Sequence, residues 1–261
     1  MYEFQLLLVA LTVIGGSILT FFSGFGLGTL MLPVMALFFP VDLAVIATAI
    51  VHLANNLFKF GLVYKHIHFH TLWRFGLPAI VSAFFGAYLL RLTGQLPTIA
   101  DYTLNGKIFS ISALKVVIGL VMISFAVIEL SKRFSKWQVS QKYLPVGGII
   151  SGFFGGLSGH QGAFRAAFLA KAGLTKDQFV GTSNAIAILI DISRLSTYFT
   201  SFYLLTNELK DPVIYVAIIA AFLGTIIGQR LMKKVTLTFI QRTVAILLIT
   251  MGTVLIAGIL Y

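Results

Sequence analysis

The sequence has no cysteine and very few charged side chains. Its 261 residues include 19 Lys and Arg and 8 Asp and Glu, so charged residues make up 10% of the chain, while 58% of the residues are hydrophobic. Without cysteine, neither a disulfide framework nor thiolate chemistry is available. A soluble domain carries about 25% charged residues because its surface faces water. The composition therefore excludes a soluble enzyme and a soluble nucleic-acid-binding protein.

Eight apolar segments fill nearly all of the sequence. A membrane-spanning helix needs about 20 mostly apolar residues, and the Lys and Arg that give the net charge of +11 lie mainly in the short gaps between segments. This pattern is typical of a multi-pass protein of the cell membrane. We therefore expect one all-α transmembrane domain over residues 1–261. The segments are residues 4–39, 41–64, 72–92, 108–130, 143–170, 179–205, 213–231 and 239–260.

The two halves of the sequence carry similar motifs in the same order. Gly15-Gly16-Ser17-Ile18 is matched by Gly147-Gly148-Ile149-Ile150, and Ala83-Phe84-Phe85-Gly86 by Ala221-Phe222-Leu223-Gly224. The common order predicts a duplicated unit of four segments. The predicted repeats are residues 1–131 and 143–261, joined by a basic linker at 132–142.

Glycines interrupt the first segment of each half. Residues 23–28 read Ser-Gly-Phe-Gly-Leu-Gly, and residues 155–162 read Gly-Gly-Leu-Ser-Gly-His-Gln-Gly. Glycine disfavours helix by about 1 kcal/mol relative to alanine, so we expect both stretches to unwind. Broken segments at matching positions of two halves indicate the binding site of a transporter. Close packing of small residues between helices is the alternative explanation.

The basic loop residues indicate that the broken segments are re-entrant. If all eight segments cross the membrane, these residues divide seven against seven; if the fifth enters and leaves by the same face, they divide eleven against three. Lys and Arg in short loops prefer the cytoplasm, which favours the second arrangement. By the repeat, the first segment should be re-entrant too, although residues 4–22 are long enough to cross. Each half then holds one broken, re-entrant hairpin and three transmembrane helices, and the repeats are inverted. The predicted cytoplasmic loops are 65–74, 132–142, 171–177 and 230–234.

With these features the chain resembles the sulfite exporter TauE/SafE family of membrane proteins. The resemblance rests on the glycine-rich stretch 23–28 with Pro33, on the stretch 155–159 with Gly162, on the two-repeat pattern and on the length, so it covers nearly the whole chain. The sequence departs from the glycine triplet expected in the second stretch, since His160 and Gln161 precede Gly162. The resemblance implies an exporter of small sulfur-containing anions such as sulfite, a sulfonate or sulfoacetate.

Polar side chains at membrane depth are costly and therefore point to function. Four of them in the second segment share one helical face, because they are spaced i, i+3, i+4 and i+7. Three more lie in the sixth segment, and His160 and Arg165 lie in and just after the second break. At the repeat offset of 135 residues, Asn56 corresponds to Asp191 and Lys59 to Arg194. The two sets are His52, Asn55, Asn56 and Lys59, and Asn184, Asp191 and Arg194.

The charges at this depth favour an anionic ligand. Three cations, Lys59, Arg165 and Arg194, face a single acid, Asp191. The helix N-termini after the two breaks add the positive ends of their dipoles. An arginine fork and backbone N–H groups suit a sulfonate or carboxylate. An Asp191–Arg194 pair of purely structural role, and snorkelling of Lys59 and Arg165 to the interface, are the alternatives. The expected substrate-binding residues are Gly24, Gly26, Gly28, His52, Asn55, Asn56, Lys59, Gly159, His160, Gln161, Gly162, Arg165, Asn184, Asp191 and Arg194.

The sequence thus predicts a secondary transporter that works by alternating access in the lipid bilayer, with protons as a coupling ion at Asp191 or His160. An anion channel is the nearest alternative, and a membrane-embedded enzyme is the alternative of another class. No Gly-x-Ser-x-Gly or His-Glu-x-x-His motif is present, and Ser158 beside His160 has no adjacent acid. We expect no catalytic activity, no cofactor and no nucleic-acid partner. His66, His68 and His70 alternate but have no acid or cysteine nearby, so we expect no metal site.

Overall fold

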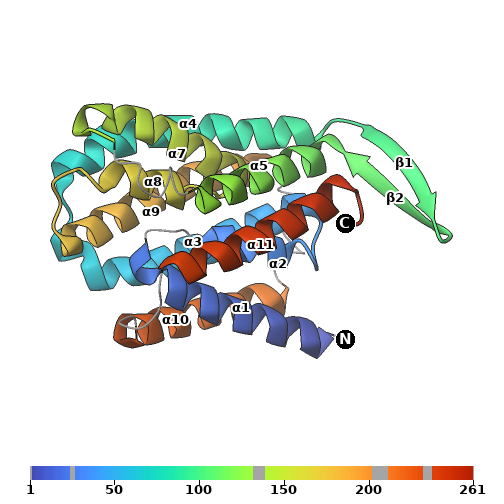
Figure 1. Ribbon diagram of the computed structural model, residues 1–261, viewed down its shortest axis with the longest axis horizontal. Helices are drawn as coiled ribbons and strands as arrows, with labels where there is room; N and C mark the ends of the chain where they lie inside the picture. Colours follow the sequence, from blue (N-terminus) through green and yellow to red (C-terminus); the bar gives the residue numbers. More distant parts are fainter. Residues whose placement is uncertain (1, 24–26, 132–138, 202–210, 232–236, 261) are drawn as a thin grey trace.

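The computed structural model describes residues 2–23, 27–131, 139–201, 211–231 and 237–260. Within these ranges the chain folds into α-helices and one small β-hairpin (Figure 1). The first half holds α1 (Tyr2–Ser23), α2 (Leu27–Met35), α3 (Val41–Val63), the 3₁₀ turn η1 (Tyr64–His66), α4 (Phe69–Gly94), β1 (Thr98–Leu104), β2 (Lys107–Ser112) and α5 (Ala113–Leu130). The second half holds η2 (Gln141–Tyr143), α7 (Leu144–Ser158), α8 (Gly162–Leu169), α9 (Lys176–Ser201), α10 (Pro212–Leu231) and α11 (Leu237–Ile256).

Five helices of the described residues are long and apolar enough to cross a membrane: α1, α3, α4, α5 and α10. Helix α11 contributes a shorter apolar stretch, Arg242–Ile256. Helix α9 is as long as α4, but it is less apolar because it carries Lys176, Asp177, Asp191 and Arg194. The chain is therefore an all-α, multi-pass membrane protein, as the sequence predicted.

The two broken segments are helical hairpins. A Cβ built on Gly16 of α1 would lie 3.0 Å from Cδ1 of Leu27 and 3.3 Å from Cδ1 of Leu30, both in α2. A Cβ built on Gly147 of α7 would likewise overlap the side chain of Phe168 in α8. Such contacts require the chain to turn back on itself after α1 and after α7. Helix α1 is long enough to cross a membrane, yet α2 returns along it.

The second break is shorter than predicted. Helix α7 continues through Gly155 and Gly156 to Ser158, and only residues 159–161 separate it from α8. A Cβ on Gly155 would come within 2.8 Å of Cγ2 of Ile190, and a Cβ on Gly156 would overlap the carbonyl group of Ala83. These two glycines therefore serve close helix packing. Gly159 has a φ of 82°, a backbone conformation that glycine adopts without strain.

Helix packing follows the order of the repeats. Helix α4 packs along α7 and α1 along α10, while α3 packs on α9 and α5 on α11 (Figure 1). If α1–α5 correspond in order to α7–α11, the operation that relates the halves converts the α4–α7 pair into the α10–α1 pair. It maps the α3–α9 pair and the α5–α11 pair onto themselves. An in-plane two-fold axis between inverted repeats produces this pattern. The residue boundaries of the repeats stay a prediction.

Glycines allow these helix pairs to approach closely. At the α5–α11 contact, a Cβ on Gly119 would lie 2.6 Å from the carbonyl oxygen of Gly252, and a Cβ on Gly252 would lie 2.8 Å from that of Gly119. On α7, glycines spaced four residues apart face the backbone of α4, as small residues do between membrane helices. The facing residues are Gly148, Gly152 and Gly156 on α7 and Phe75, Ala79 and Ala83 on α4.

A β-hairpin that the sequence analysis missed follows α4. Residues 108–112, predicted as the start of the fourth helix, belong to β2, and α5 begins only at Ala113. Asn105 and Gly106 form the two-residue turn with φ values of 52° and 76°. Asn-Gly is the preferred dipeptide for such a turn because both residues tolerate positive φ, and it was the signal in the sequence. The hydroxyl of Tyr102 donates to the carbonyl oxygen of Ala257 at 2.5 Å, which ties the hairpin to the end of α11.

Several loops predicted to be cytoplasmic lie together at one end of the bundle. The backbone N–H of His68 donates to Oγ1 of Thr182 at 2.9 Å, and a Cβ on Gly173 would lie 3.1 Å from Nε2 of Gln141. The α3–α4 and α8–α9 connections occupy the left end in Figure 1, whereas the β-hairpin projects from the opposite end. The basic residues predicted at 132–136 and 233–234 lie outside the described residues. Which membrane face each end occupies stays a prediction.

Candidate functional site

Asp191, in the middle of α9, is completely buried and accepts hydrogen bonds at both carboxylate oxygens. Its Oδ1 accepts from Nε of Arg194 at 3.0 Å, from Nη2 of Arg194 at 2.8 Å and from Nε2 of Gln161 at 3.2 Å. Its Oδ2 lies 2.6 Å from Nδ1 of His52 and accepts from Nδ2 of Asn56 at 3.1 Å. This carboxylate therefore joins α3, α9 and the tip of the second hairpin.

The hydrogen-bond network extends from Asp191 into α8 and along α9. Oε1 of Gln161 accepts from Nη1 of Arg165 at 2.7 Å, and Nε of Arg165 donates to Oγ of Ser183 at 2.8 Å. Nδ2 of Asn184 donates to Oδ1 of Asn56 at 3.1 Å. Residues predicted separately from the two halves of the sequence thus share one buried network.

Two predicted residues sit at the edge of this network. Asn55 points toward α10, where its Oδ1 accepts from Oγ1 of Thr225 at 2.7 Å. Lys59 is only 9% exposed. Its burial, and the 4% exposure of Arg165, place both cations inside the protein.

The start of α2 meets the second glycine break inside the bundle. A Cβ built on Gly28, in the first turn of α2, would lie 3.5 Å from the carbonyl oxygen of Gly159 and 3.8 Å from Cδ2 of His52. Gly162 begins α8 three residues after Gly159. Gly24 and Gly26, predicted in the same site, lie outside the described residues. The start of α2 and the tip of the second hairpin are therefore in contact beside the α3 face that carries His52.

Arg194 brings an unpaired donor to this meeting point. Its guanidinium is completely buried, and Nη1 has no hydrogen-bond partner although Nε and Nη2 both donate to Asp191. A Cβ on Gly159 would lie 2.9 Å from that Nη1. Oγ1 of Thr48, whose Cγ2 lies 3.5 Å from a Cβ on Gly28, also lacks a partner. A buried polar group without a partner costs about 1–3 kcal/mol, so these atoms mark a place where a ligand can supply what the protein does not.

His160 lies at the hairpin tip but apart from Asp191. Its Nδ1 is 2.9 Å from Oγ of Ser158, its ring centroid is 5.0 Å from that of Phe125, and its Nε2 has no partner. The Ser158 hydroxyl donates to the carbonyl oxygen of Phe154 at 3.2 Å. Within the described residues, the Ser158–His160 pair has no acid to orient the imidazole as a catalytic triad requires.

Several buried polar residues escaped the sequence analysis. The hydroxyl of Tyr198, seven residues after Asp191 and so on the same face of α9, donates to the carbonyl oxygen of Gly156. Glu129 in α5 is 3% exposed, so Asp191 is not the single acid inside the protein, as the sequence analysis had counted it. An acid inside an apolar segment is itself a signal of function, and Glu129 could have been found by it. Ser183 and Thr225 carry no charge, and only the fold shows their partners.

The described residues contain no group of three His, Cys, Asp or Glu side chains that could hold a metal ion. Of the three alternating histidines, His68 is the N-cap of α4, where its Nδ1 accepts from the backbone N–H of Thr71 at 3.3 Å. His68 therefore has a structural role as a helix cap.

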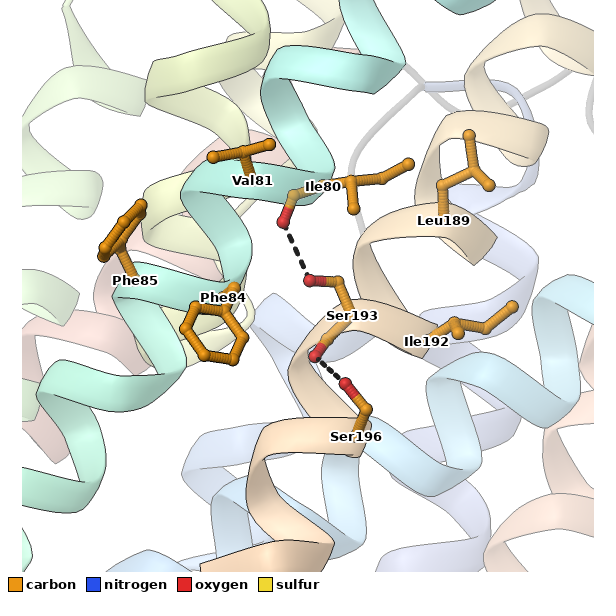
Figure 2. Close-up of a pocket in the computed structure, with 8 residues that line it drawn as sticks. All are labelled: Ile80, Val81, Phe84, Phe85, Leu189, Ile192, Ser193 and Ser196. Atoms are coloured by element: carbon orange, nitrogen blue, oxygen red, sulfur yellow. Dashed lines mark hydrogen bonds between the residues drawn. The ribbon is translucent and has the colours of Figure 1, made fainter.

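A groove of about 560 Å³ lies between α4 and α9, and no residue of the charged network lines it (Figure 2). Its two hydroxyls are already bonded: Ser193 donates to the carbonyl oxygen of Ile80 at 2.8 Å, and Ser196 to that of Ser193 at 2.7 Å. The groove therefore offers no charge for an anion and has the apolar lining of a lipid-facing surface. The other residues that line it are Val81, Phe84, Phe85, Leu189 and Ile192.

Membrane helices arranged as two broken hairpins, whose tips meet beside buried charged side chains, define a membrane transport protein. The family model described as "Sulfite exporter TauE/SafE" matches residues 8–255, and the chain belongs to this family. The family is one of transporters, in agreement with the resemblance drawn from the sequence. No curated protein and no solved structure matches the chain.

Proposed function

We propose that the protein is a secondary transporter that exports a small sulfur-containing anion, such as sulfite, a sulfonate or sulfoacetate, by alternating access. The family supports the class of substrate. The proposed site lies where the two hairpin tips meet, and protons are the proposed coupling ion. The proposed orientation places the basic loops in the cytoplasm.

The observation that carries this proposal is the unpaired Nη1 of Arg194 beside the two hairpin tips. Asp191 holds the other two donor atoms of the guanidinium and so fixes its plane. The remaining N–H groups are pre-organised for an oxygen of an anion, and charge-assisted hydrogen bonds of this kind are the strong ones. The Asp191–Arg194 pair therefore has a structural role and also orients a donor for the substrate.

The backbone of the hairpin tips supplies further donors. The first-turn N–H groups of α2 and α8 have no partners within their own helices, and the dipoles of both helices favour an anion at these ends. Because Gly28 and Gly159 have no side chain, a ligand can approach these N–H groups closely. An oxyanion with three sulfur-bound oxygens can then contact Arg194 and both tips together.

The balance of buried charge also favours an anion. Lys59, Arg165 and Arg194 are buried cations, and the buried acids are Asp191 and Glu129. Among the described residues, the buried cations remain in excess even if both acids are ionised. Burying this excess in a low-dielectric interior is costly without a counter-charge, and a bound anion supplies one.

Alternating access fits the burial of the site. His52, Asp191 and Arg194 are between 0% and 2% exposed, so an anion reaches them only when the hairpins move relative to the other helices. We propose that each hairpin tip opens toward one membrane face in turn. A channel, the competing proposal, would give a flux that does not saturate and does not depend on an anion on the opposite side.

Binding and exchange of radiolabelled sulfite test the proposal, with Arg194→Lys as the variant. Lysine keeps the charge near Asp191 but has no second arm for the ligand, so we expect the affinity for sulfite to fall about tenfold to a hundredfold, as loss of one charged hydrogen bond predicts. Arg74→Lys, at an exposed position on α4, is the matched control and should bind normally. Sulfite should also raise the thermal unfolding temperature of the wild-type protein in detergent more than chloride does. Equal effects of chloride and sulfite, or unchanged sulfite affinity in Arg194→Lys, would exclude this site.

A further inference from the structure

Glu129 is a buried acid that takes no part in the proposed anion site. It lies in the last turn of α5, is 3% exposed, and neither carboxyl oxygen has a hydrogen-bond partner. An ionised carboxylate buried without donors costs several kcal/mol. Acids in membrane helices mark ion and proton pathways.

The position of Glu129 links it to the second hairpin. It shares the buried face of α5 with Met122, Phe125 and Ala126, at a spacing that places them on one side of the helix. The ring of Phe125, one turn or about 6 Å earlier along the axis, lies 5.0 Å from the ring of His160. Glu129 is therefore on the face of α5 that packs against the tip of this hairpin.

The hairpin contacts of α5 are extensive at this point. The Phe125 ring also lies 5.3 Å from Phe154 in α7 and 5.2 Å from Phe164 in α8, so both arms of the hairpin press on this face. A movement of the hairpin must change the surroundings of the residues along it. Alternating access requires such a movement of the second hairpin.

Among the described residues, no charged side chain pairs with Glu129. In the part of the chain that the structure describes, Glu129 forms no ion pair and no hydrogen bond. The C-terminal dipole of α5 also disfavours a negative charge in its last turn. The charged and titratable side chains on the elements packed against α5 are Asp42, His52 and Lys59 on α3; His70, Arg74, Tyr88 and Arg91 on α4; Lys107 on β2; His160 and Arg165 at the second hairpin; and Arg242 on α11.

Asp191 is a poor alternative as the proton site. Its two oxygens accept from Arg194, Gln161 and Asn56 and contact His52. A proton on Oδ1 would displace a donor of Arg194 or Gln161 and leave it unpaired, and a proton on Oδ2 would be held in the short contact with Nδ1 of His52 and so would be less free to leave. Glu129 has no such contact to lose.

We propose that Glu129 binds and releases the coupling proton of the transport cycle, an inference that rests on the proposed function. While the second hairpin packs on α5, the carboxyl group holds the proton on one oxygen and is neutral. When the hairpin moves, water reaches the group and the proton leaves as the carboxylate forms. The anion site and the proton site are then coupled through the same moving element.

Transport in proteoliposomes separates coupling from anion transport. Radiolabelled sulfite is exchanged for unlabelled sulfite at equal pH on both sides, and its accumulation is then driven by pH gradients of either sign. We expect Glu129→Gln, which has the shape of the neutral carboxyl, to exchange sulfite within about twofold of the wild type and to lose accumulation above the equilibrium level. Glu129→Asp, which keeps an ionisable group, should retain part of the accumulation. Liposomes without protein supply the blank.

A second measurement tests the proton directly, without transport. Infrared spectra of the wild-type protein at neutral pH should show the C=O stretch of a protonated carboxyl group, and Glu129→Gln should lack that band. Wild-type accumulation in Glu129→Gln, loss of exchange together with accumulation in that variant, or absence of the band from the wild type would each overturn the inference. If wild-type protein shows the band but exchanges no sulfite, the proposed function fails while the proton site at Glu129 stands.

Discussion

Asn56 and Asp191, which lie 135 residues apart at equivalent positions of the two halves, hydrogen bond to each other at 3.1 Å. Residues related by a two-fold axis touch only where they lie on or next to the axis. For the predicted repeats, the contact therefore places such an axis between α3 and α9, the helices that carry most of the buried polar network. Asp191 in the place of an Asn breaks the symmetry there, because a carboxylate forms an ion pair with Arg194 and a neutral amide does not.

Gly28→Ala tests whether the space between the hairpin tips is used by the substrate. The added Cβ would make only ordinary contacts, at 3.5 Å from the carbonyl oxygen of Gly159 and from Cγ2 of Thr48. Alanine also favours helix by up to about 1 kcal/mol, so we expect unfolding in detergent at an unchanged or higher temperature. Exchange of radiolabelled sulfite should nevertheless fall at least tenfold, because the methyl group occupies the proposed site.

Gly15→Ala is the matched control for this variant. It lies in the same hairpin, and a Cβ there meets no atom within 4 Å. Exchange in Gly15→Ala should equal that of the wild type. Full exchange in Gly28→Ala would move the anion away from the hairpin tips.

Gly152→Ala tests the close contact of α4 and α7. The new Cβ would overlap the carbonyl oxygen of Ala79 and come within 2.7 Å of its Cα. Because the obstructing atoms are backbone, the helices must separate, and overpacking of this kind costs about 1–3 kcal/mol or more. We expect a clear fall in the unfolding temperature in detergent, followed by circular dichroism or by a fluorescent size-exclusion assay.

Gly61→Ala, at a position with no atom within 4 Å of the added Cβ, controls for the loss of a helical glycine. It should unfold at or above the wild-type temperature. Equal stability of Gly152→Ala and Gly61→Ala would mean that α4 and α7 are farther apart than the structure shows.

Single cysteines test the orientation in the membrane, and the absence of natural cysteine makes the experiment clean. Thr103→Cys lies on the exposed β-hairpin and Lys65→Cys at the exposed α3–α4 connection, at opposite ends of the bundle (Figure 1). Because basic loops stay in the cytoplasm, a membrane-impermeant maleimide should label Thr103→Cys in intact cells and Lys65→Cys only after permeabilisation. The reverse pattern would invert the proposed orientation and the direction of export.

Composition and periodicity predicted more of the fold than of the site. Glycine density predicted helix breaks at residues 23–28 and 155–162. In the first stretch Ser23, Leu27 and Gly28 are helical and residues 24–26 lie outside the described residues, and in the second Gly155 and Gly156 stay helical against Ile190 and Ala83. Glycine residues occur both where a helix unwinds and where two helices pack closely, so the number of glycines in a stretch does not show which of the two it does. Spacing placed Asn55 on the face of His52 and Asn56, yet Asn55 bonds to Thr225 of α10, because a face about one turn wide can meet two neighbouring helices.

The sequence by itself determined that this chain is a multi-pass membrane protein, and it predicted two repeats and an interior with more positive than negative side chains. These properties follow from hydropathy, motif order and composition, which can be read along the sequence without knowing which residues come into contact. Only the tertiary structure decided that Arg194 gives two donors to Asp191 and keeps a third beside Gly159, and that Glu129 stands without a partner. Hydrogen bonds are satisfied within about 3 Å, and which groups come that close depends on how helices distant in sequence pack.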